Sequence, residues 1–338
     1  MATMDHEEIE RMFRDDKAWS DYANSRRIAL SCSPSQSNFR VFAILIVEDV
    51  IKLKYQLIEG ANSEQGYIGG AICAERAALV KIRFLEESHA KIRKVIVVTD
   101  NTEPISPGLL CREYLMSYCE ISTPVVMGSC SSEKVISCEL GSLYPFPYAY
   151  RLENRDNLCK VAGEISKVLT MEMLDEDMAK AYRAAVAAVV HDRTISIHPL
   201  QLAAAIIFET GDIEVAWQLK GLEYGCTLDP VSQLVSVMER RKICSECSVS
   251  TSTDESVFEQ PQFKYSSLPK YLVMVDQFGV AHAPFAQARA LLYEHGFGDI
   301  RVIVHNMTSK ELEIVLASSL APQPQGGRLL SHDDFVGV

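Results

Sequence analysis

Two cysteines and a glutamate have the clearest chemical potential in this chain. Cys73 and Glu75 lie in the stretch CAER, and Cys111 ends the stretch PGLLC. Both cysteines stand at predicted helix starts, where the positive end of the helix dipole lowers the pKa of a thiol and favours a bound cation. We therefore expect the two helix starts to meet and hold one metal ion between them, with Glu75 beside the metal but not bound to it.

Three further side chains suit a ligand that combines a sugar with a planar base. Asn62 and Glu64 follow a predicted strand in the stretch GANSEQ. An amide and a carboxylate are good hydrogen-bonding partners for sugar hydroxyls. Phe39 begins an earlier predicted strand, and its aromatic face can hold a planar base.

The elements that must position these residues follow from hydrophobic periodicity. Apolar, β-branched runs predict buried strands, an alternating run predicts an antiparallel partner, and apolar residues at helical spacing predict helices. In chain order we predict a helix over 5–30, strands over 38–47 and 51–60, a helix over 73–87, a strand over 94–100, a helix over 111–119, and strands over 123–128 and 134–141. This order predicts an α/β fold with a mixed, mostly five-stranded sheet and helices on both faces.

The second half of the chain repeats the first. The stretch LQLAAAIIFETGDIEVAWQ follows the order of FRVFAILIVEDVIKLKYQ: apolar strand, acidic turn, alternating strand and final glutamine. Further on, YLVMVDQ repeats VIVVTDN, and HAPFAQARALL repeats ISPGLLCREYL. Three similar segments in one order predict a duplicated domain. We place the first domain at 1–155, a degenerate second domain at 156–322 and a loose tail at 323–338.

The second copy lacks the metal-binding residues of the first. In the sequence alignment of the copies, Thr227 stands for Cys73 and Asp229 for Glu75. The same alignment places Phe285 at the position of Gly108 and Ala288 at that of Cys111. We therefore predict no metal in the second copy.

Several of these stretches, in this order, resemble the cytidine deaminase family. The wider superfamily carries His or Cys, any residue, Glu, and later Pro-Cys-x-x-Cys. CAE and PGLLC are similar to the two halves of that signature, NFRVFAILI to the base-stacking strand, and GANSEQ to the ribose-binding segment. The degenerate second copy is similar to that of the long, duplicated-domain members. The resemblance implies a three-layer α/β/α sandwich with a mixed sheet, two tandem copies of it, and a homodimer.

The resemblance also implies a reaction and the residues that perform it. The reaction is hydrolysis of cytidine or deoxycytidine to uridine or deoxyuridine and ammonia, as in pyrimidine salvage, with zinc as the cofactor that activates a water. The resemblance assigns acid–base catalysis to Glu75, zinc binding to Cys73 and Cys111, substrate binding to Phe39, Asn62, Glu64 and Ala74, and compensation of thiolate charge to Arg76 and Arg112.

The chain departs from the family at Gly108. Gly108 stands where the family carries its first loop cysteine, so two of three expected thiolates remain. A catalytic zinc normally has three protein ligands and a water.

Three hypotheses follow from this departure. A third ligand comes from elsewhere in the domain, where Cys119, Cys130 and Cys138 stand, although each is better interpreted as a small buried hydrophobic residue. Alternatively, the metal is held weakly with an extra water and the enzyme is slow. In the third hypothesis the chain is a pseudoenzyme that binds nucleosides or a protein partner. The other retained site residues favour a deaminase.

Composition limits the other classes of function. The net charge of −12 argues against a nucleic-acid-binding protein. No apolar run approaches the roughly 20 residues that a membrane span needs. The charged first sixteen residues predict no secretory signal, so we expect a cytoplasmic protein with reduced cysteines. Cys244 and Cys247 have no second pair at zinc-site spacing, and we interpret them as two thiols in a Ser-rich loop.

Overall fold

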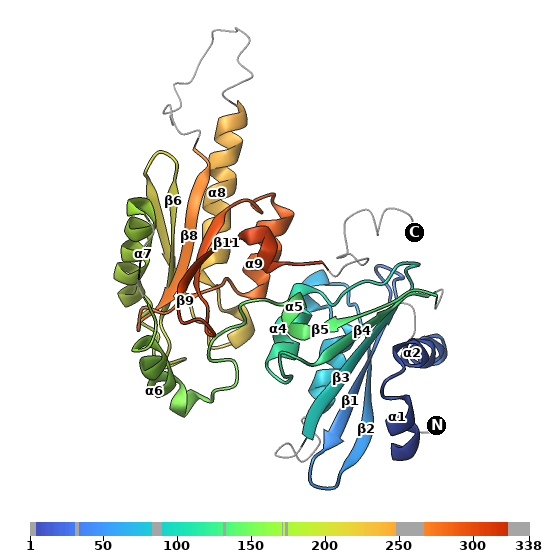
Figure 1. The fold of residues 1–338 in the computed structure, drawn as a ribbon. Helices are drawn as coiled ribbons and strands as arrows, with labels where there is room; N and C mark the ends of the chain where they lie inside the picture. The colour runs from blue at the N-terminus through green and yellow to red at the C-terminus, as the bar shows by residue number, and fades with distance from the viewer. Residues whose placement is uncertain are drawn as a thin grey trace, which may run out of the picture. The chain divides into compact units, whose positions relative to one another are not determined.

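The chain forms two compact units. The computed structural model describes residues 5–30, 34–82, 90–130, 133–170, 172, 175–247 and 267–323. Unit 1 comprises Met1–Pro145 with Pro322–Val338, and unit 2 comprises Phe146–Ala321 (Figure 1). The boundary drawn from the sequence lies after residue 155, ten residues beyond the division between the units.

Unit 1 has the predicted order of helices and strands. The helix predicted over 5–30 is divided in two, because Phe13 caps the first segment and the second begins at Asp16. The elements are α1 (His6–Met12), α2 (Asp16–Leu30), β1 (Val41–Asp49), β2 (Lys54–Ala61), η1 (Ile68–Gly70), α3 (Ala74–Ile82), β3 (Ala90–Thr99), α4 (Leu109–Met116), β4 (Pro124–Gly128), β5 (Val135–Glu139) and α5 (Leu140–Leu143).

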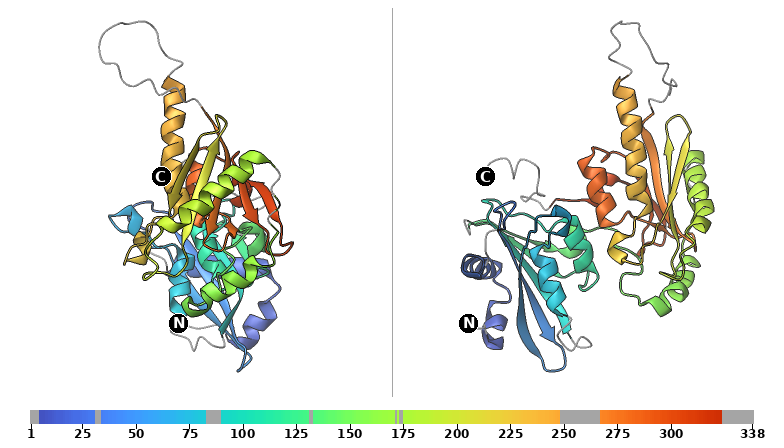
Figure 2. Two further views of the ribbon diagram at one scale, coloured as in Figure 1. Left: turned by 90° about the vertical axis from the view of Figure 1, so that its left-hand side faces the viewer. Right: turned by 180° about the vertical axis from the view of Figure 1, so that it is seen from behind.

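The sheet of unit 1 is mixed and five-stranded. Its order is β2-β1-β3-β4-β5, and only β3 and β4 run parallel. Helices α1 and α2 cover one face, and α3 and α4 cover the other (Figures 1 and 2). Trp19 and Ile9 pack onto Phe42 and Ile44 on the first face.

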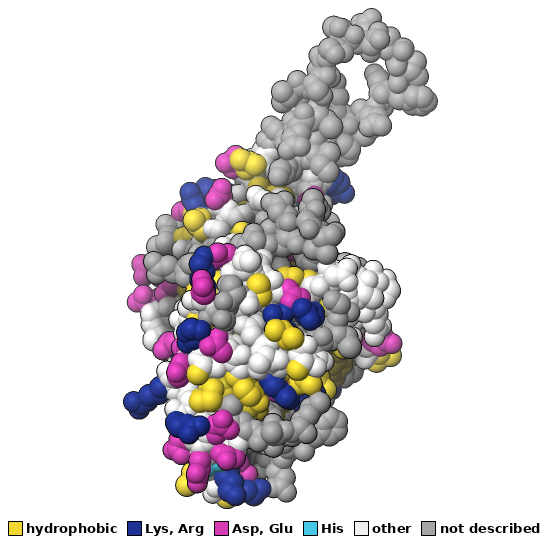
Figure 3. Space-filling model, turned by 90° about the vertical axis from the view of Figure 1, so that its right-hand side faces the viewer, with side chains coloured by type: hydrophobic (Ala, Val, Ile, Leu, Met, Phe, Trp, Pro, Cys, Tyr) yellow, Lys and Arg dark blue, Asp and Glu magenta, His cyan; other side chains and the backbone are white. Residues whose placement is uncertain are grey.

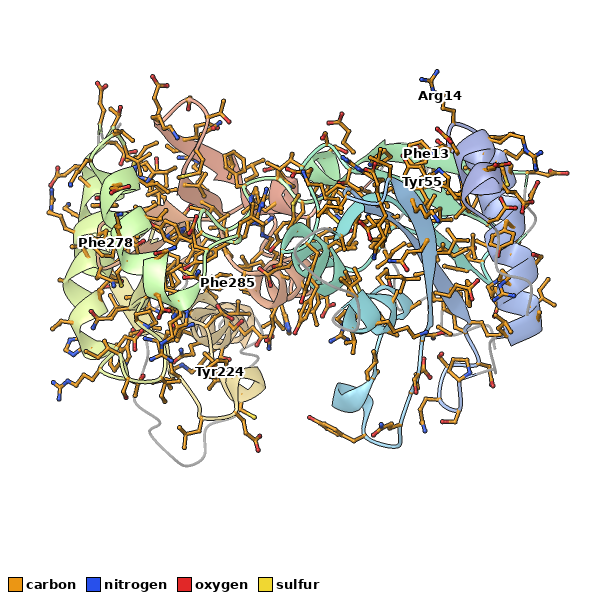
Figure 4. All side chains as sticks on the ribbon, turned by 90° about the horizontal axis from the view of Figure 1, so that it is seen from below. Phe13, Arg14, Tyr55, Tyr224, Phe278 and Phe285 are labelled. Atoms are coloured by element: carbon orange, nitrogen blue, oxygen red, sulfur yellow. The ribbon has the colours of Figure 1, made fainter. Side chains whose placement is uncertain are left out.

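An aromatic contact attaches the N-terminal helices to the edge of this sheet. Phe13, which follows α1, stacks on Tyr55 of β2 with ring centroids 5.6 Å apart (Figure 4). His6 of α1 also stacks on this ring, with centroids 5.4 Å apart, and its Nδ1 accepts a hydrogen bond from the Tyr55 amide. The edge strand β2 is thereby covered.

Unit 2 contains a second sheet and its own helices. One helix, α6, has no counterpart among the sequence-based predictions. The elements are α6 (Arg155–Ser166), α7 (Glu176–Ala188), η3 (Val189–His191), β6 (Leu202–Phe208), β7 (Ile213–Trp217), η4 (Tyr224–Cys226), α8 (Pro230–Cys247), β8 (Pro269–Asp276), β9 (Ala281–His282), α9 (Ala286–Glu294), β10 (Arg301–His305), β11 (Leu312–Leu316) and η5 (Ala317–Leu320).

The two sheets share one topology. The order in unit 2 is β7-β6-β8-β10-β11, and β8 and β10 are the parallel pair. The register shifts at equivalent points, between Ile46 and Val47 in β1 and between Ile207 and Phe208 in β6. Helix α7 packs on one face of the second sheet, and α8 and α9 pack on the other. The prediction of an α/β/α sandwich with a mixed sheet in two tandem copies is therefore confirmed.

Two predictions fall near the limits of the described residues. Cys244 and Cys247 lie in the last turns of α8, so the prediction of a loop was wrong there; their side chains lie outside the described part of the chain. Of the predicted loose tail, only residue 323 is described. None of the helices in the described ranges combines the length and the apolar character that crossing a membrane requires.

Candidate active site

A close approach of backbone to backbone positions the first cysteine. A Cβ at Gly60 of β2 would lie 2.2 Å from the carbonyl oxygen of Ala74 and 2.5 Å from the amide nitrogen of Ala78. Only glycine therefore allows the first turns of α3 to lie this near the sheet. Cys73 directly precedes α3, and Glu75 is its second residue.

One cavity collects almost all of the predicted site residues. Its volume is about 170 Å³. Of the positions predicted from the sequence, seven line it: Phe39, Asn62, Glu64, Cys73, Glu75, Gly108 and Cys111. Ala74 is fully buried and is not among the lining residues. The Ala74 carbonyl oxygen packs against Gly60, so Ala74 contacts strand β2 and does not line the cavity.

Two thiols and one carboxylate form a cluster in the cavity wall. The sulfur atoms of Cys73 and Cys111 and a carboxylate oxygen of Glu75 all lie within 4.8 Å of one another. Within the described ranges this is the one group of three or more such side chains that could hold a metal ion. Three donors are the number of protein ligands that catalytic zinc takes, and thiolates suit zinc. The residues present therefore fit a zinc ion.

The electrostatics of the cluster separate the two thiols. The pKa of Cys73 falls to about 6, first because Cys111 hydrogen-bonds to its sulfur and also because Arg76 lies beside it. The Arg76 Nη2 to Cys73 Sγ distance is 3.7 Å. The pKa of Cys111 is raised, because its proton is held in the bond to Cys73 and because the thiol is buried. Cys73 is thus the thiol of the pair that loses its proton more readily, which suits it to be an anionic metal ligand.

Glu75 is a buried carboxyl group next to an anionic sulfur. Glu75 is only 3% exposed. Burial and the negative charge on Cys73 raise the pKa of Glu75 to about 7. A carboxyl group with a pKa near neutrality suits a side chain that must both take and return a proton.

Asn62 orders the segment just before β1 that carries Phe39, which was predicted to begin the strand itself. Its Oδ1 accepts a hydrogen bond from the Val41 amide at 2.8 Å, and its Nδ2 donates to the Phe39 carbonyl at 2.8 Å. An amide has a second lone pair and a second hydrogen, so these bonds leave capacity for a ligand. Asn62 therefore fixes the backbone on both sides of Arg40 and lines the cavity as well.

Ser37 is a lining residue that sequence reasoning missed. Its hydroxyl donates to Glu64 Oε1 at 2.6 Å, and its amide donates to Oε2 at 2.8 Å. Glu64 is thereby held in one orientation at the cavity wall. The one sequence signal was the position of Ser37, two residues before Phe39, in a stretch interpreted only as a strand boundary.

The two arginines of the predicted site do different things. Arg76 contacts a thiol, as expected. Arg112 is fully buried, and its guanidinium donates to the carbonyls of Pro107 (2.7 Å), Leu143 (2.6 Å) and Pro322 (2.8 Å). These bonds hold the loop before α4 to the end of α5 and to Pro322, which belongs to unit 1.

Gly108 leaves open space beside the cluster. No atom outside its immediate chain neighbours lies within 4 Å of the Cβ position that a side chain would occupy there. Cys119, Cys130 and Cys138 are not members of the cluster. Cys119 is buried as expected, but Cys130 is exposed and Cys138 is only half-buried, so the interpretation of these two as buried residues was wrong.

The second unit shows what replaces these residues. An isolated bridge pairs Ser63 with Ile72 in unit 1, and the equivalent bridge pairs Leu219 with Leu228 in unit 2. Asp229, which follows Leu228, therefore occupies the position of Cys73. The sequence alignment that placed Thr227 there was wrong by two residues, because it matched one acid with another.

The helix starts fix the remaining matches between the two units: one sequence-based match changes, and two are confirmed. Asp229 accepts hydrogen bonds from the amides of Val231 and Ser232 at 3.0 and 2.9 Å, as an N-terminal cap of α8. Val231 thus stands at the position of Glu75. Phe285 caps α9 as Gly108 caps α4, so Ala288 matches Cys111.

Comparison with known proteins gives relatives of one kind. The chain is 33% identical over 93 residues to a cytidine deaminase of Halalkalibacterium halodurans, a match that covers 28% of this chain and 65% of that protein. It is 29% identical over 105 residues to a cytidine deaminase of Sporosarcina psychrophila, covering 31% of this chain and 72% of the relative. The chain thus spans slightly less than two thirds of the first relative's length. No family model matches the chain.

Solved structures of cytidine deaminases are also similar to parts of the chain. The protein from Burkholderia pseudomallei matches at 24% identity with a TM-score of 0.33, covering 39% of this chain and 97% of that one. The protein from Mycobacterium leprae matches at 19% identity with a TM-score of 0.31, covering 44% of this chain and 100% of that one.

Proposed function

We propose that this chain, which belongs to the cytidine deaminase family, hydrolyses cytidine or deoxycytidine to uridine or deoxyuridine and ammonia. The observation that carries the proposal is the cluster of Cys73, Cys111 and Glu75 in the wall of one cavity. Phe39 and Asn62 line the same cavity, so groups suited to a base and a sugar stand beside groups suited to a metal.

The two cysteines hold the zinc in this proposal. When bound, zinc lowers the pKa of a water to about 7, which supplies the nucleophile at neutral pH. Cys73 is the better prepared ligand because its thiol has the lowered pKa. Arg76 offsets part of the negative charge of that sulfur from 3.7 Å.

Glu75 carries the protons. It takes one proton from the water that attacks C4 of the pyrimidine and delivers it to N3. It then takes a second proton from the new C4 hydroxyl and delivers it to the amino group, which leaves as ammonia when the C4–N bond breaks. A pKa of about 7 allows both directions of transfer at neutral pH. Burial keeps bulk water from exchanging with the carried proton.

The remaining residues of the cavity bind the nucleoside. Phe39 stacks on the base, and Asn62 and Glu64 bind the ribose hydroxyls. Ser37 orients the Glu64 carboxylate through its two hydrogen bonds. We assign Ala74 a supporting part, since its backbone seats α3 on Gly60.

The test is turnover of cytidine by the zinc-loaded protein, followed by the loss of cytidine absorbance. Glu75→Gln should lower kcat/KM by about 10²- to 10⁴-fold, the usual contribution of a general acid–base. Glu120→Gln, an exposed carboxylate of the same unit, is the control and should retain wild-type turnover. Absence of turnover in the wild type, with zinc bound, would sink the proposal.

Gly108 favours a second candidate, a pseudoenzyme that binds nucleosides or a protein partner. The position that carries a ligand in the family signature is open here. This candidate predicts binding of cytidine, measured by calorimetry, without any conversion to uridine. Turnover that depends on Glu75 would exclude it.

The surroundings of the enzyme form part of the proposal. We propose a cytoplasmic homodimer that acts in pyrimidine salvage on a free nucleoside. Acidic and basic side chains alternate on the face drawn in Figure 3, and the net charge is −12, so nucleic acid is a poor partner. Sedimentation of the purified chain tests the dimer.

A further inference from the structure

We propose that Glu75 is itself the third protein ligand of the metal in the substrate-free protein, in place of the side chain that Gly108 lacks. The carboxylate would leave the metal when the nucleoside enters and then act in proton transfer. This inference rests on the proposed function, because it assigns a second role to the same site.

The distances within the cluster allow such a site. With zinc–sulfur bonds of about 2.3 Å and zinc–oxygen bonds of about 2.1 Å, tetrahedral donors lie roughly 3.5–3.8 Å apart. The donor atoms of Cys73, Glu75 and Cys111 all lie within 4.8 Å of one another. The three side chains therefore need to close by about 1.3 Å at most, which small rotations about their side-chain bonds supply.

The surroundings of Glu75 favour a cation at its carboxylate. A buried carboxylate is costly unless a positive group or several hydrogen bonds compensate it. Its neighbouring cation, Arg76, directs Nη2 to the Ala71 carbonyl at 2.9 Å and to the Cys73 sulfur. A metal bound directly to Glu75 would add a full positive charge to the hydrogen bonds that the Glu75 amide and the Cys111 thiol give the carboxylate.

Gly108 removes the competitor for this coordination position. The space at its Cβ is empty, and no other cysteine of the described first unit belongs to the cluster. Glu75 is thus the third donor already within reach. A protein with a thiolate at position 108 would have its three ligands without Glu75, and the carboxylate would be free for proton transfer at all times.

Zinc affinity in a double-mutant cycle tests this inference without using turnover. The four proteins are the wild type, Glu75→Ala, Gly108→Cys and the double variant, titrated with zinc against a chromophoric chelator. In the wild-type background Glu75→Ala should weaken zinc binding by more than about 100-fold, the upper end of what groups outside the ligand set cost. In the Gly108→Cys background the same change should weaken it by less than about 10-fold.

Controls keep the cycle interpretable. Glu64→Ala removes another carboxylate from the same cavity, one outside the cluster, and should leave zinc affinity unchanged. If Glu75→Ala does not fold, Glu75→Gln replaces it, because the amide has nearly the same volume and is a much poorer ligand. An equal effect of the Glu75 substitution in both backgrounds, or no effect in either, overturns the inference.

The same four proteins separate this inference from the proposed function. Coupling between positions 75 and 108 without cytidine turnover in any variant would support the metal site and reject the deaminase. Turnover that needs Glu75, without such coupling, would support the deaminase and reject Glu75 as a ligand. When both hold, Gly108→Cys should also increase kcat, since Glu75 no longer has to leave the metal.

Discussion

The two units share a framework but differ at the end of the sheet where the cavity of unit 1 lies. Unit 1 places Cys73 and Glu75 at the start of α3, whereas unit 2 has Asp229 and Val231 at the equivalent positions. In unit 2 the position of Cys73 is a helix cap, and the position of Glu75 belongs to the apolar core. The comparison teaches that very few side chains separate a candidate metal site from a purely structural helix start.

Aromatic and polar side chains gather in the equivalent region of unit 2. Phe285, at the position of Gly108, packs against Tyr148 with ring centroids 5.4 Å apart (Figure 4). Buried Asp276, which takes the place of cavity-lining Thr99, accepts hydrogen bonds from Tyr150 at 2.7 Å and from His282 at 3.0 Å. Where unit 1 has a cavity for a ligand, unit 2 satisfies its own buried polar groups.

The arginines show what both units retained. Arg289 donates from Nε to the Pro284 carbonyl at 2.7 Å, as Arg112 does to Pro107. It also reaches Leu320 at 3.1 Å, as Arg112 reaches Leu143. The repeated proline and arginine therefore belong to the framework, although Pro107 and Arg112 flank the predicted ligand positions in the sequence.

The strongest test of this shared framework removes the arginines. Arg112→Met and Arg289→Met should each destabilise the protein by about 3–5 kcal/mol, because each leaves several buried carbonyls without a donor. Urea unfolding measures both. A loss of zinc binding by Arg112→Met with unchanged stability would instead make this arginine part of the metal site.

A smaller effect is expected at Gly60, where the units differ. Gly60→Ala should cost about 1–3 kcal/mol and weaken zinc binding, because its Cβ collides with the backbone of α3. Unit 2 has Ala216 at the equivalent strand position, so Ala216→Gly is the matched control, with a cost of about 1 kcal/mol and no effect on zinc. Equal behaviour of the two variants toward zinc would contradict the positioning role of Gly60.

The smallest effect concerns pH and is confined to unit 2. His305 stands where unit 1 has Gly128, and burial lowers its pKa to about 4. Its Nδ1 accepts from the Ala281 amide at 2.8 Å, which protonation would break. The unfolded chain binds the proton more readily, so stability present above the ordinary pKa of 6.5 is lost as pH falls toward 4.

The free energy of unfolding should change with pH by about 1 kcal/mol per pH unit at its steepest between pH 6.5 and 4. His305→Gln should flatten this slope, as measured by urea unfolding between pH 7 and 4. A slope unaltered by His305→Gln would assign the pH dependence to other groups.

Local patterns in the sequence predicted most of the framework and most of the site. Apolar runs identified β1 and β3, and the spacing of Cys73, Glu75 and Cys111 predicted a cluster that the structure brings together. These features depend on periodicity and helix starts, which a short stretch of sequence encodes.

Contacts between distant residues were not predictable in this way. The two bonds of Ser37 to Glu64 join a loop to a strand end 27 residues away, and nothing in the local sequence indicates them. Arg112 was expected beside a thiolate because it follows Cys111, but the direction of its long side chain depends on carbonyls far along the chain. The register of Asp229 likewise depends on a bridge that the sequence does not display.

One of those distant carbonyls limits how the protein can be divided. Pro322 follows the last element of unit 2 yet belongs to unit 1, where its carbonyl binds Arg112. Phe146 follows the elements of unit 1 and belongs to unit 2, where its carbonyl binds Arg289. A gene fragment that ends at residue 145 would thus encode an arginine without one of its acceptors. Residues 146–321 keep the Pro284, Leu320 and Phe146 acceptors of Arg289, so this dependence on a distant part of the chain belongs to unit 1.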